Sequence, residues 1–192
     1  MRLTQMIRVP ALAAAVLMCL APIAGAQPTT VVLVRHAEKA ATPGPDQELS
    51  EAGLARAAAL ASALSDASVS TIITTQFQRT RATAAQLAVK LGLTPITVAA
   101  GAELSAHAQA TAKAVRARLA GEVVLVVGHS NTIPAIIRAL GGPDFPELCE
   151  SEYDNLFILQ IDSARPARLL RTRYGATDDA DAPPCVQSMR QP

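Results

Sequence analysis

The sequence predicts an α/β fold, a three-layer α/β/α sandwich with a mostly parallel central sheet and helices on both faces. Two observations support this prediction. Apolar runs of strand length alternate along the chain with segments of helical periodicity. Two of these runs, 31–34 and 123–127, contain only Val and Leu, which is typical of strands that are buried on both faces.

The first strand is expected at 31–34, and a loop rich in Pro and Gly follows it at 42–46. Ser50 is suited to cap a helix, with Glu51 in the first turn. Apolar residues then recur at helical spacing, namely Leu54, Ala57, Ala58, Ala61 and Leu64.

The remaining elements alternate in the same way as far as residue 140. They are a strand at 69–75, a helix at 80–91 that Gly92 ends, a short strand at 96–98, a helix at 104–119 that Gly121 ends, a central strand at 123–127, and a helix at 132–140 that Gly141 ends. The last two strands, 156–161 and 168–174, alternate more between apolar and polar residues. They are expected at the outer part of the sheet, where antiparallel pairing is also open to them.

The first 26 residues are predicted to form a secretory signal peptide. Arg2 and Arg8 give a positive start, 9–23 is almost wholly apolar, and Ala24-Gly25-Ala26 fits a cleavage site. The alternative is a buried N-terminal helix. Cys19 lacks the small residue expected just upstream of a lipidated cysteine, so the prediction is export to the periplasm or medium, without stable membrane insertion after cleavage.

Cleavage after Ala26 leaves 27–192 as a single domain, with an irregular tail from about residue 176. This part of the chain carries 15 basic and 16 acidic residues, so it has no strong net field for nucleic acid or anionic membrane. The chain has no Trp and few other aromatic residues for stacking on bases. A nucleic-acid partner is therefore not expected.

Two cysteines remain after cleavage, Cys149 and Cys185. In an exported protein, an even pair favours a disulfide, which would tie the Pro-rich tail to the loop around residue 149. Two free thiols are the alternative. A catalytic cysteine is not expected, because no His is adjacent to either position in the sequence.

Charged and imidazole side chains follow three of the predicted strands. Arg35 and His36 follow the first strand, Arg79 follows the second, and His129 follows the strand at 123–127. Because the carboxyl ends of parallel strands meet at one edge of a sheet, these side chains are expected to gather there. Two arginines, two histidines and helix N-termini together predict a pocket for a phosphate dianion.

Other polar residues nearby are given structural roles. Arg81 is expected to be a solvated helix charge, while Ser130 and Asn131 are expected to cap the helix after His129. Glu38 and Lys39 are expected to form an ion pair at the surface. His107 is expected at the surface or in a structural role, and His36 and His129 lack further ligands at metal-site spacing.

The chain resembles the histidine phosphatase superfamily, also called the phosphoglycerate mutase-like superfamily. The family's Arg-His-Gly type motif reads Arg35-His36-Ala37, and its Ser-x-x-x-Arg-x-x-x-Thr-Ala type motif reads Thr75-Gln76-Phe77-Gln78-Arg79-Thr80-Arg81-Ala82-Thr83-Ala84. A Gly-His motif follows at Gly128-His129. Each motif alone is weak, but the three occur in the right order and on the right predicted elements.

The resemblance implies a phosphoglycerate mutase-like fold and a phosphatase that works through a phosphohistidine on His36. Arg35, Arg79 and His129 would bind the phosphoryl oxygens as charge builds up on them. The arginines supply positive charge, so neither a metal nor another cofactor is expected.

Two departures from the family pattern stand out. The Gly after the nucleophile is Ala37 here, which cannot adopt positive φ cheaply. The acid that protonates the leaving group is not fixed by the motifs. Glu103 is slightly preferred over Glu38, and Asp154 is a weaker candidate.

The favoured function is an exported phosphomonoesterase. The alternatives are a mutase of the same superfamily and a binding module for phosphoryl ligands without turnover. Short loops predict an open site, whose substrate could be a phosphorylated small molecule, an envelope sugar or a phosphoprotein.

Overall fold

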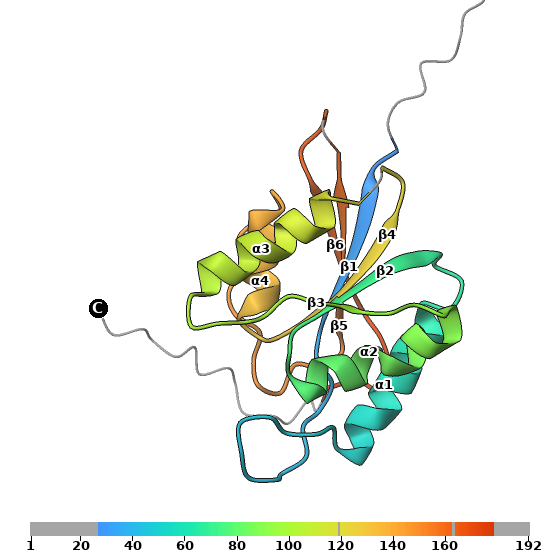
Figure 1. Cartoon of the computed structure of the whole chain (residues 1–192), viewed down its shortest axis with the longest axis vertical. Helices are drawn as coiled ribbons and strands as arrows, with labels where there is room; N and C mark the ends of the chain where they lie inside the picture. The colour runs from blue at the N-terminus through green and yellow to red at the C-terminus, as the bar shows by residue number, and fades with distance from the viewer. Residues whose placement is uncertain (1–26, 119, 163, 179–192) are drawn as a thin grey trace, which may run out of the picture.

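We describe a computed structural model of the chain, and the description covers residues 27–118, 120–162 and 164–178. The predicted signal peptide, Cys185 and most of the predicted irregular tail lie outside the described residues. The described part contains a sheet of six strands, shown in Figure 1: β1 Thr29–Arg35, β2 Val69–Thr74, β3 Ile96–Thr97, β4 Val123–Gly128, β5 Asn155–Ile161 and β6 Arg168–Arg173.

The strand order is β3-β2-β4-β1-β5-β6. Strands β1 to β4 pair in parallel, whereas β5 runs antiparallel to β1 and β6 antiparallel to β5. The sheet is therefore mixed, and the prediction of a mostly parallel sheet was wrong. The physical reason lies in the connections: no crossover helix separates β5 from β6, so the chain returns through a short turn and pairs antiparallel.

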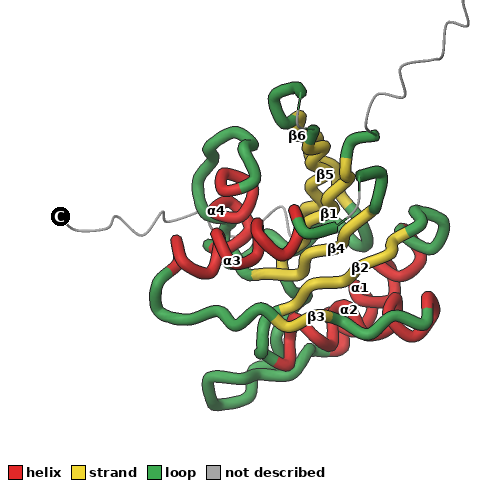
Figure 2. The backbone as a smooth tube through the Cα atoms, turned by 45° about the horizontal axis from the view of Figure 1, so that its top comes forward, coloured by secondary structure: helices red, strands yellow, loops and turns green. Residues whose placement is uncertain are grey.

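Four helices cover the two faces of the sheet: α1 Glu51–Ala63, α2 Gln78–Leu91, α3 Leu104–Arg116 and α4 Thr132–Ala139. Alternate residues of β1 divide the core. Val31 and Leu33 pack with residues of α3 and α4, and Val32 and Val34 pack with residues of α1 and α2. Figure 2 shows these two helix pairs on either side of the sheet, which is the three-layer arrangement that the sequence predicts.

Most helix ends agree with the sequence signals. Ser50 caps α1 by accepting a hydrogen bond from the Gly53 backbone N–H at 3.1 Å, and Gly92 ends α2 with φ of 65°. Helix α3 stops at Arg116, three residues earlier than predicted.

The buried face of α1 was partly mispredicted. Leu54 is exposed, whereas Arg56 and Leu60 are buried. Ala57, Ala61 and Leu64 are buried as the periodicity predicts, and Arg56 is buried beside them because it has a partner from the loop after β1, described below.

No helix in the described ranges is both long enough and apolar enough to cross a membrane.

Candidate active site

The register of the sheet brings the predicted site residues to one edge. Arg35 at the end of β1 lies opposite Gly128 at the end of β4, and the His36 backbone N–H donates to the Gly128 carbonyl at 2.9 Å. Gly128 allows α4 to start close behind the strand, since a Cβ there would lie 2.7 Å from the Thr132 hydroxyl oxygen. The two histidine rings lie side by side, with centroids 5.3 Å apart and the ring planes at 65°.

The tautomer of His36 follows from its hydrogen bond. Its Nδ1 lies 2.8 Å from the carbonyl oxygen of Ala37, which can only accept, so Nδ1 carries the proton. The lone pair is then on Nε2, where a nucleophile needs it. Burial is the main cause that lowers the pKa of His36 to about 3, and the charges of Arg35 and Arg79 add to this effect.

Ala37 adopts an ordinary backbone conformation without positive φ, and its N–H donates to the Thr83 hydroxyl at 2.9 Å. The replacement of the family's Gly by Ala is thereby accommodated without strain.

A chain of hydroxyl groups fixes the tautomer of His129. The Thr80 hydroxyl donates to the Phe77 carbonyl at 2.9 Å, so it accepts from the Thr75 hydroxyl at 3.0 Å. Thr75 in turn accepts from His129 Nε2 at 3.0 Å. His129 Nδ1 is left as an acceptor, with Arg79 at a long contact of 3.5 Å. Burial and then Arg79 lower the pKa of His129 to about 3.

Two arginines flank this histidine pair. Arg79 stacks on Phe77 at 4.3 Å and donates to the Pro45 carbonyl at 3.2 Å, while Arg35 stacks on Tyr153 at 4.1 Å. Both Nε atoms are buried, and neither has a hydrogen-bond partner among the described residues. Buried donors without partners beside two histidines are suited to bind the oxygens of an anion.

A third cation, Lys39, was missed by the sequence interpretation, which paired it with Glu38. The positive charge of Lys39 acts on His129, and its Nζ lies 3.7 Å from Glu150. The position of Lys39 just after Arg35 and His36 placed it near the site. The sequence alone does not say toward which side of the strand end its side chain points.

The segment 149–153 also borders the site, and the sequence interpretation missed it. Arg35 is only 1% exposed because this segment covers it. Its NH1 donates to the carbonyls of Cys149, Glu150 and Glu152 at 2.6, 3.0 and 3.2 Å. Its NH2 donates to the Glu150 carboxylate at 2.8 Å. The segment lies just before β5 and carries no motif, so no local signal could place it at the site.

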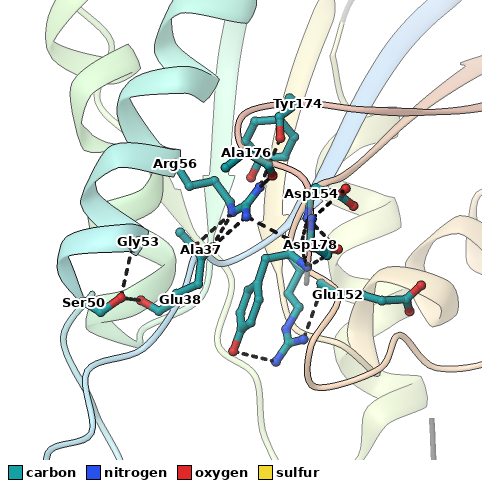
Figure 3. A network of polar contacts seen from close by, with 12 residues as sticks. Ala37, Glu38, Ser50, Gly53, Arg56, Glu152, Asp154, Tyr174, Ala176 and Asp178 are labelled. Atoms are coloured by element: carbon teal, nitrogen blue, oxygen red, sulfur yellow. Dashed lines mark hydrogen bonds and ion pairs between the residues drawn. The ribbon is translucent and has the colours of Figure 1, made fainter. Parts of the chain in front are cut away.

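Of the predicted acids, Glu38 is bound to Arg56. Both carboxylate oxygens accept from Arg56 Nε, at 2.9 and 3.0 Å, and an Arg56 NH2 lies 2.7 Å from one of them. Figure 3 shows Arg56 between Glu38 and Asp178, next to Tyr174. Glu38 thus accepts in an ion pair with the buried Arg56, so the expected surface pair with Lys39 was wrong, while the acid role of Glu38 stays a prediction.

Asp154 is likewise held by a cation. Arg173 donates to both of its oxygens at 2.6 Å. Burial alone would raise the pKa of Asp154, but the hydrogen bonds from Arg173 and Asp178 lower it, so Asp154 is deprotonated near neutral pH and has no proton to donate. Glu103 precedes the first residue of α3 and is exposed. Among the described residues, therefore, none of the three predicted acids contacts His36 or His129.

Three other expectations have mixed outcomes. His107 is buried, with Nδ1 donating to the Ala99 carbonyl at 3.0 Å, so a surface position was wrong and a structural role fits. Arg81 is exposed, as expected. Asn131 precedes α4 without a side-chain cap, and it is Thr132 that accepts from the His129 N–H, at 2.7 Å. Cys149 lies next to the site, and its pairing with Cys185 stays a prediction because Cys185 is outside the described residues.

The two buried histidines predict a loss of stability in acid. The unfolded chain takes up protons near pH 6.5, whereas the folded pKa values of His36 and His129 are about 3. Their contribution is therefore complete above pH 6.5 and is lost as pH falls toward 3, by roughly 2 kcal/mol for each histidine between pH 7 and pH 5.

Urea unfolding at pH 7 and pH 5 measures this loss. We expect a variant with both His36→Gln and His129→Gln to show a clearly smaller pH dependence than the parent. An equal pH dependence in the two proteins would mean that the histidines are not buried in the neutral form.

Comparison with known proteins agrees with this geometry. Residues 31–105 match the model of the histidine phosphatase superfamily (branch 1), a range that includes the motifs at Arg35-His36 and at Arg79. Over this range, which is less than half of the chain, the sequence is similar to the histidine phosphatase superfamily. No curated protein matches the chain.

Several solved structures share the fold of this chain. The structure of Mycobacterial hydrolase 1 is 19% identical to this chain, with a TM-score of 0.60, and the match covers 79% of this chain and 100% of the hydrolase. The protein histidine phosphatase SixA in complex with tungstate is 17% identical, with a TM-score of 0.57 and coverage of 75% and 96%. Mycobacterial glucosyl-3-phosphoglycerate phosphatase with inorganic phosphate is 19% identical, with a TM-score of 0.57 and coverage of 77% and 97%.

Proposed function

We propose that this protein is a phosphatase that hydrolyses phosphomonoesters through a phosphohistidine on His36. The observation that carries the proposal is the state of His36: its Nδ1 proton is engaged by Ala37, which leaves the Nε2 lone pair free beside a group of cations. Several structural neighbours are phosphatases by name, and one of them holds inorganic phosphate, which supports the proposal.

In the first step, His36 Nε2 attacks phosphorus and the ester oxygen leaves. Arg35, Arg79 and Lys39 bind the phosphoryl oxygens and offset the negative charge that spreads over them in the transition state. In the second step, water attacks the phosphohistidine, which releases phosphate and restores neutral His36.

Neutral His129 has its Nδ1 lone pair on the side of Arg79. A bound phosphate dianion would raise the pKa of His129, so a proton taken up there would turn Nδ1 into a donor toward a phosphoryl oxygen. The hydroxyl chain through Thr75 and Thr80 keeps the ring in the orientation that this contact requires.

The proposal includes metal-independent catalysis, because three side-chain cations supply the charge that a metal would otherwise provide. It also includes export to the periplasm or medium, supported by Arg2, the apolar run 9–23 and the Ala24-Gly25-Ala26 site. The substrate is proposed to be a phosphorylated small molecule, an envelope sugar or a phosphoprotein.

Hydrolysis of 4-nitrophenyl phosphate by residues 27–192 tests the proposal. We expect turnover that is unchanged by an excess of EDTA. A folded protein that binds inorganic phosphate but turns over neither aryl nor alkyl phosphates would contradict phosphatase activity, and loss of turnover with EDTA would contradict metal independence.

A further inference from the structure

Hydrolysis of an ordinary phosphate ester needs a proton for the leaving oxygen, and the predicted donors are poorly placed to give one. Glu38 is ion-paired with Arg56 and Asp154 with Arg173. One carboxylate, however, lies directly against the cations of the site. Glu150 is 2.8 Å from Arg35 NH2 and 3.7 Å from Lys39 Nζ, and its charge also acts on Arg79.

We propose that Glu150 is the catalytic acid of this site, which protonates the leaving oxygen of the phosphomonoester. The proposal rests on the phosphohistidine function stated above. Glu150 would thereby fill the role for which sequence patterns offered Glu103, Glu38 and Asp154.

The contacts of Arg35 show how a substrate and Glu150 can occupy the site together. Arg35 NH1 fixes the backbone of the segment by donating to the carbonyls of Cys149, Glu150 and Glu152. Arg35 NH2 instead holds the Glu150 carboxylate, whose side chain is 73% exposed. A phosphoryl oxygen can take over NH2 while NH1 keeps the segment in place.

After this exchange, the carboxyl group has moved only by rotation of its own side chain. It therefore stays next to the cations that bind the ester, on the solvent-exposed side of Arg35. Exposure also suits an acid that has to exchange its proton with water in every cycle.

The charge balance of the site changes in the direction that an acid needs. Burial raises the pKa of Glu150, but Arg35 and Lys39 lower it by more, so that it lies below its ordinary value. A dianionic phosphate engages both cations and places negative charge beside the carboxyl group. Both changes raise the pKa of Glu150, so the proton is bound when the substrate is bound.

The two steps balance with Glu150 as the only proton carrier. His36 Nε2 forms a bond to phosphorus, the phosphorus–oxygen ester bond breaks, and the leaving oxygen takes the Glu150 proton to become an alcohol. Water then attacks phosphorus and gives a proton to the Glu150 carboxylate, the phosphorus–nitrogen bond breaks, and phosphate leaves.

The test is the dependence of kcat on the leaving group in Glu150→Gln. Gln keeps an oxygen that can accept from Arg35 but cannot act as the acid. We expect kcat for an alkyl phosphate to fall by about 100-fold or more. For 4-nitrophenyl phosphate, whose leaving group needs little protonation, we expect a change of less than about threefold.

The pH profile gives a second readout. With the alkyl phosphate, kcat of the parent should fall as pH rises and Glu150 loses its proton in the complex, and Glu150→Gln should lack this limb. Glu51→Gln, an exposed change in the first turn of α1, is the matched control, and it should behave as the parent does. Thermal melting of each variant checks that it is folded.

Three results would overturn the proposal. Equal losses for both esters in Glu150→Gln would indicate a structural role, and tighter phosphate binding with an unchanged leaving-group dependence would make Glu150 only a competing anion. A selective loss in Glu103→Gln with none in Glu150→Gln would assign the acid to Glu103. Failure of the phosphatase function itself is distinguishable, since the parent would then hydrolyse neither ester.

Discussion

Replacement of His36 by Asn should reduce kcat for 4-nitrophenyl phosphate by at least about 10³-fold, because the phosphoryl group loses its acceptor. Asn is the sharpest choice at this position. Its side-chain amide can still donate to the Ala37 carbonyl, as His36 Nδ1 does, while it offers no nucleophilic nitrogen. Steady-state kinetics of the two proteins give the ratio.

Phosphate binding is the internal control for this variant. Arg35, Arg79 and Lys39 remain, so calorimetry should give a dissociation constant for inorganic phosphate within about tenfold of the parent value. If His36→Asn keeps a tenth or more of the parent kcat while it binds phosphate normally, His36 is not the nucleophile.

Replacement of Arg56 by Met should destabilise the protein by about 3–5 kcal/mol, the usual cost when one partner of a buried ion pair is removed. The Arg56 side chain is only 4% exposed, and the change leaves the carboxylates of Glu38 and Asp178 without it. It also removes donors at 3.1 and 2.9 Å from the carbonyls of Tyr174 and Ala176. Urea unfolding at pH 7 measures the difference.

Arg165→Met is the matched control for this change. Arg165 also pairs with a carboxylate, Asp162, at 2.8 Å, but its side chain is 71% exposed. Removal of this surface pair should cost no more than about 1 kcal/mol. Similar losses in the two variants would mean that burial of the Arg56 network does not contribute as argued.

Arg56 also links the end of the described chain to the catalytic strand end. Asp178 accepts hydrogen bonds from the backbone N–H groups of Tyr153 and Asp154, while Arg56 bridges Asp178 and Glu38 (Figure 3). Glu38 follows His36 by two residues, and Tyr153 lies beneath the Arg35 guanidinium. One buried arginine thus supports both sides of the site.

The sequence predicts those features of this molecule that depend on local patterns. Apolar runs locate every strand to within one or two residues, and Ser50 and Gly92 mark helix ends because their side chain or conformation acts locally. Parallel pairing of the strands before His36 and His129 was also predictable. The two histidines could therefore be expected at one edge of the sheet, together with Arg35 and Arg79.

The features that were missed depend on contacts between distant segments. Glu38 and Arg56 are 18 residues apart, and Arg35 and Glu150 are 115 apart, so neither pair leaves a spacing pattern. Arg56 on the buried face of α1 also contradicts the apolar periodicity that the sequence suggests. The alternation in β5 and β6 is typical of antiparallel strands, but it does not say which strand each of them pairs with.

The most direct test of the account is a search for the covalent intermediate. The parent protein is mixed with an aryl phosphate that carries ³²P, quenched in alkali within milliseconds, and digested for mass spectrometry. We predict label on the peptide that contains His36, stable in alkali and lost in acid as expected of a phosphohistidine, and absent from His36→Asn. Rapid turnover without any labelled protein, or label on another residue, would contradict the account.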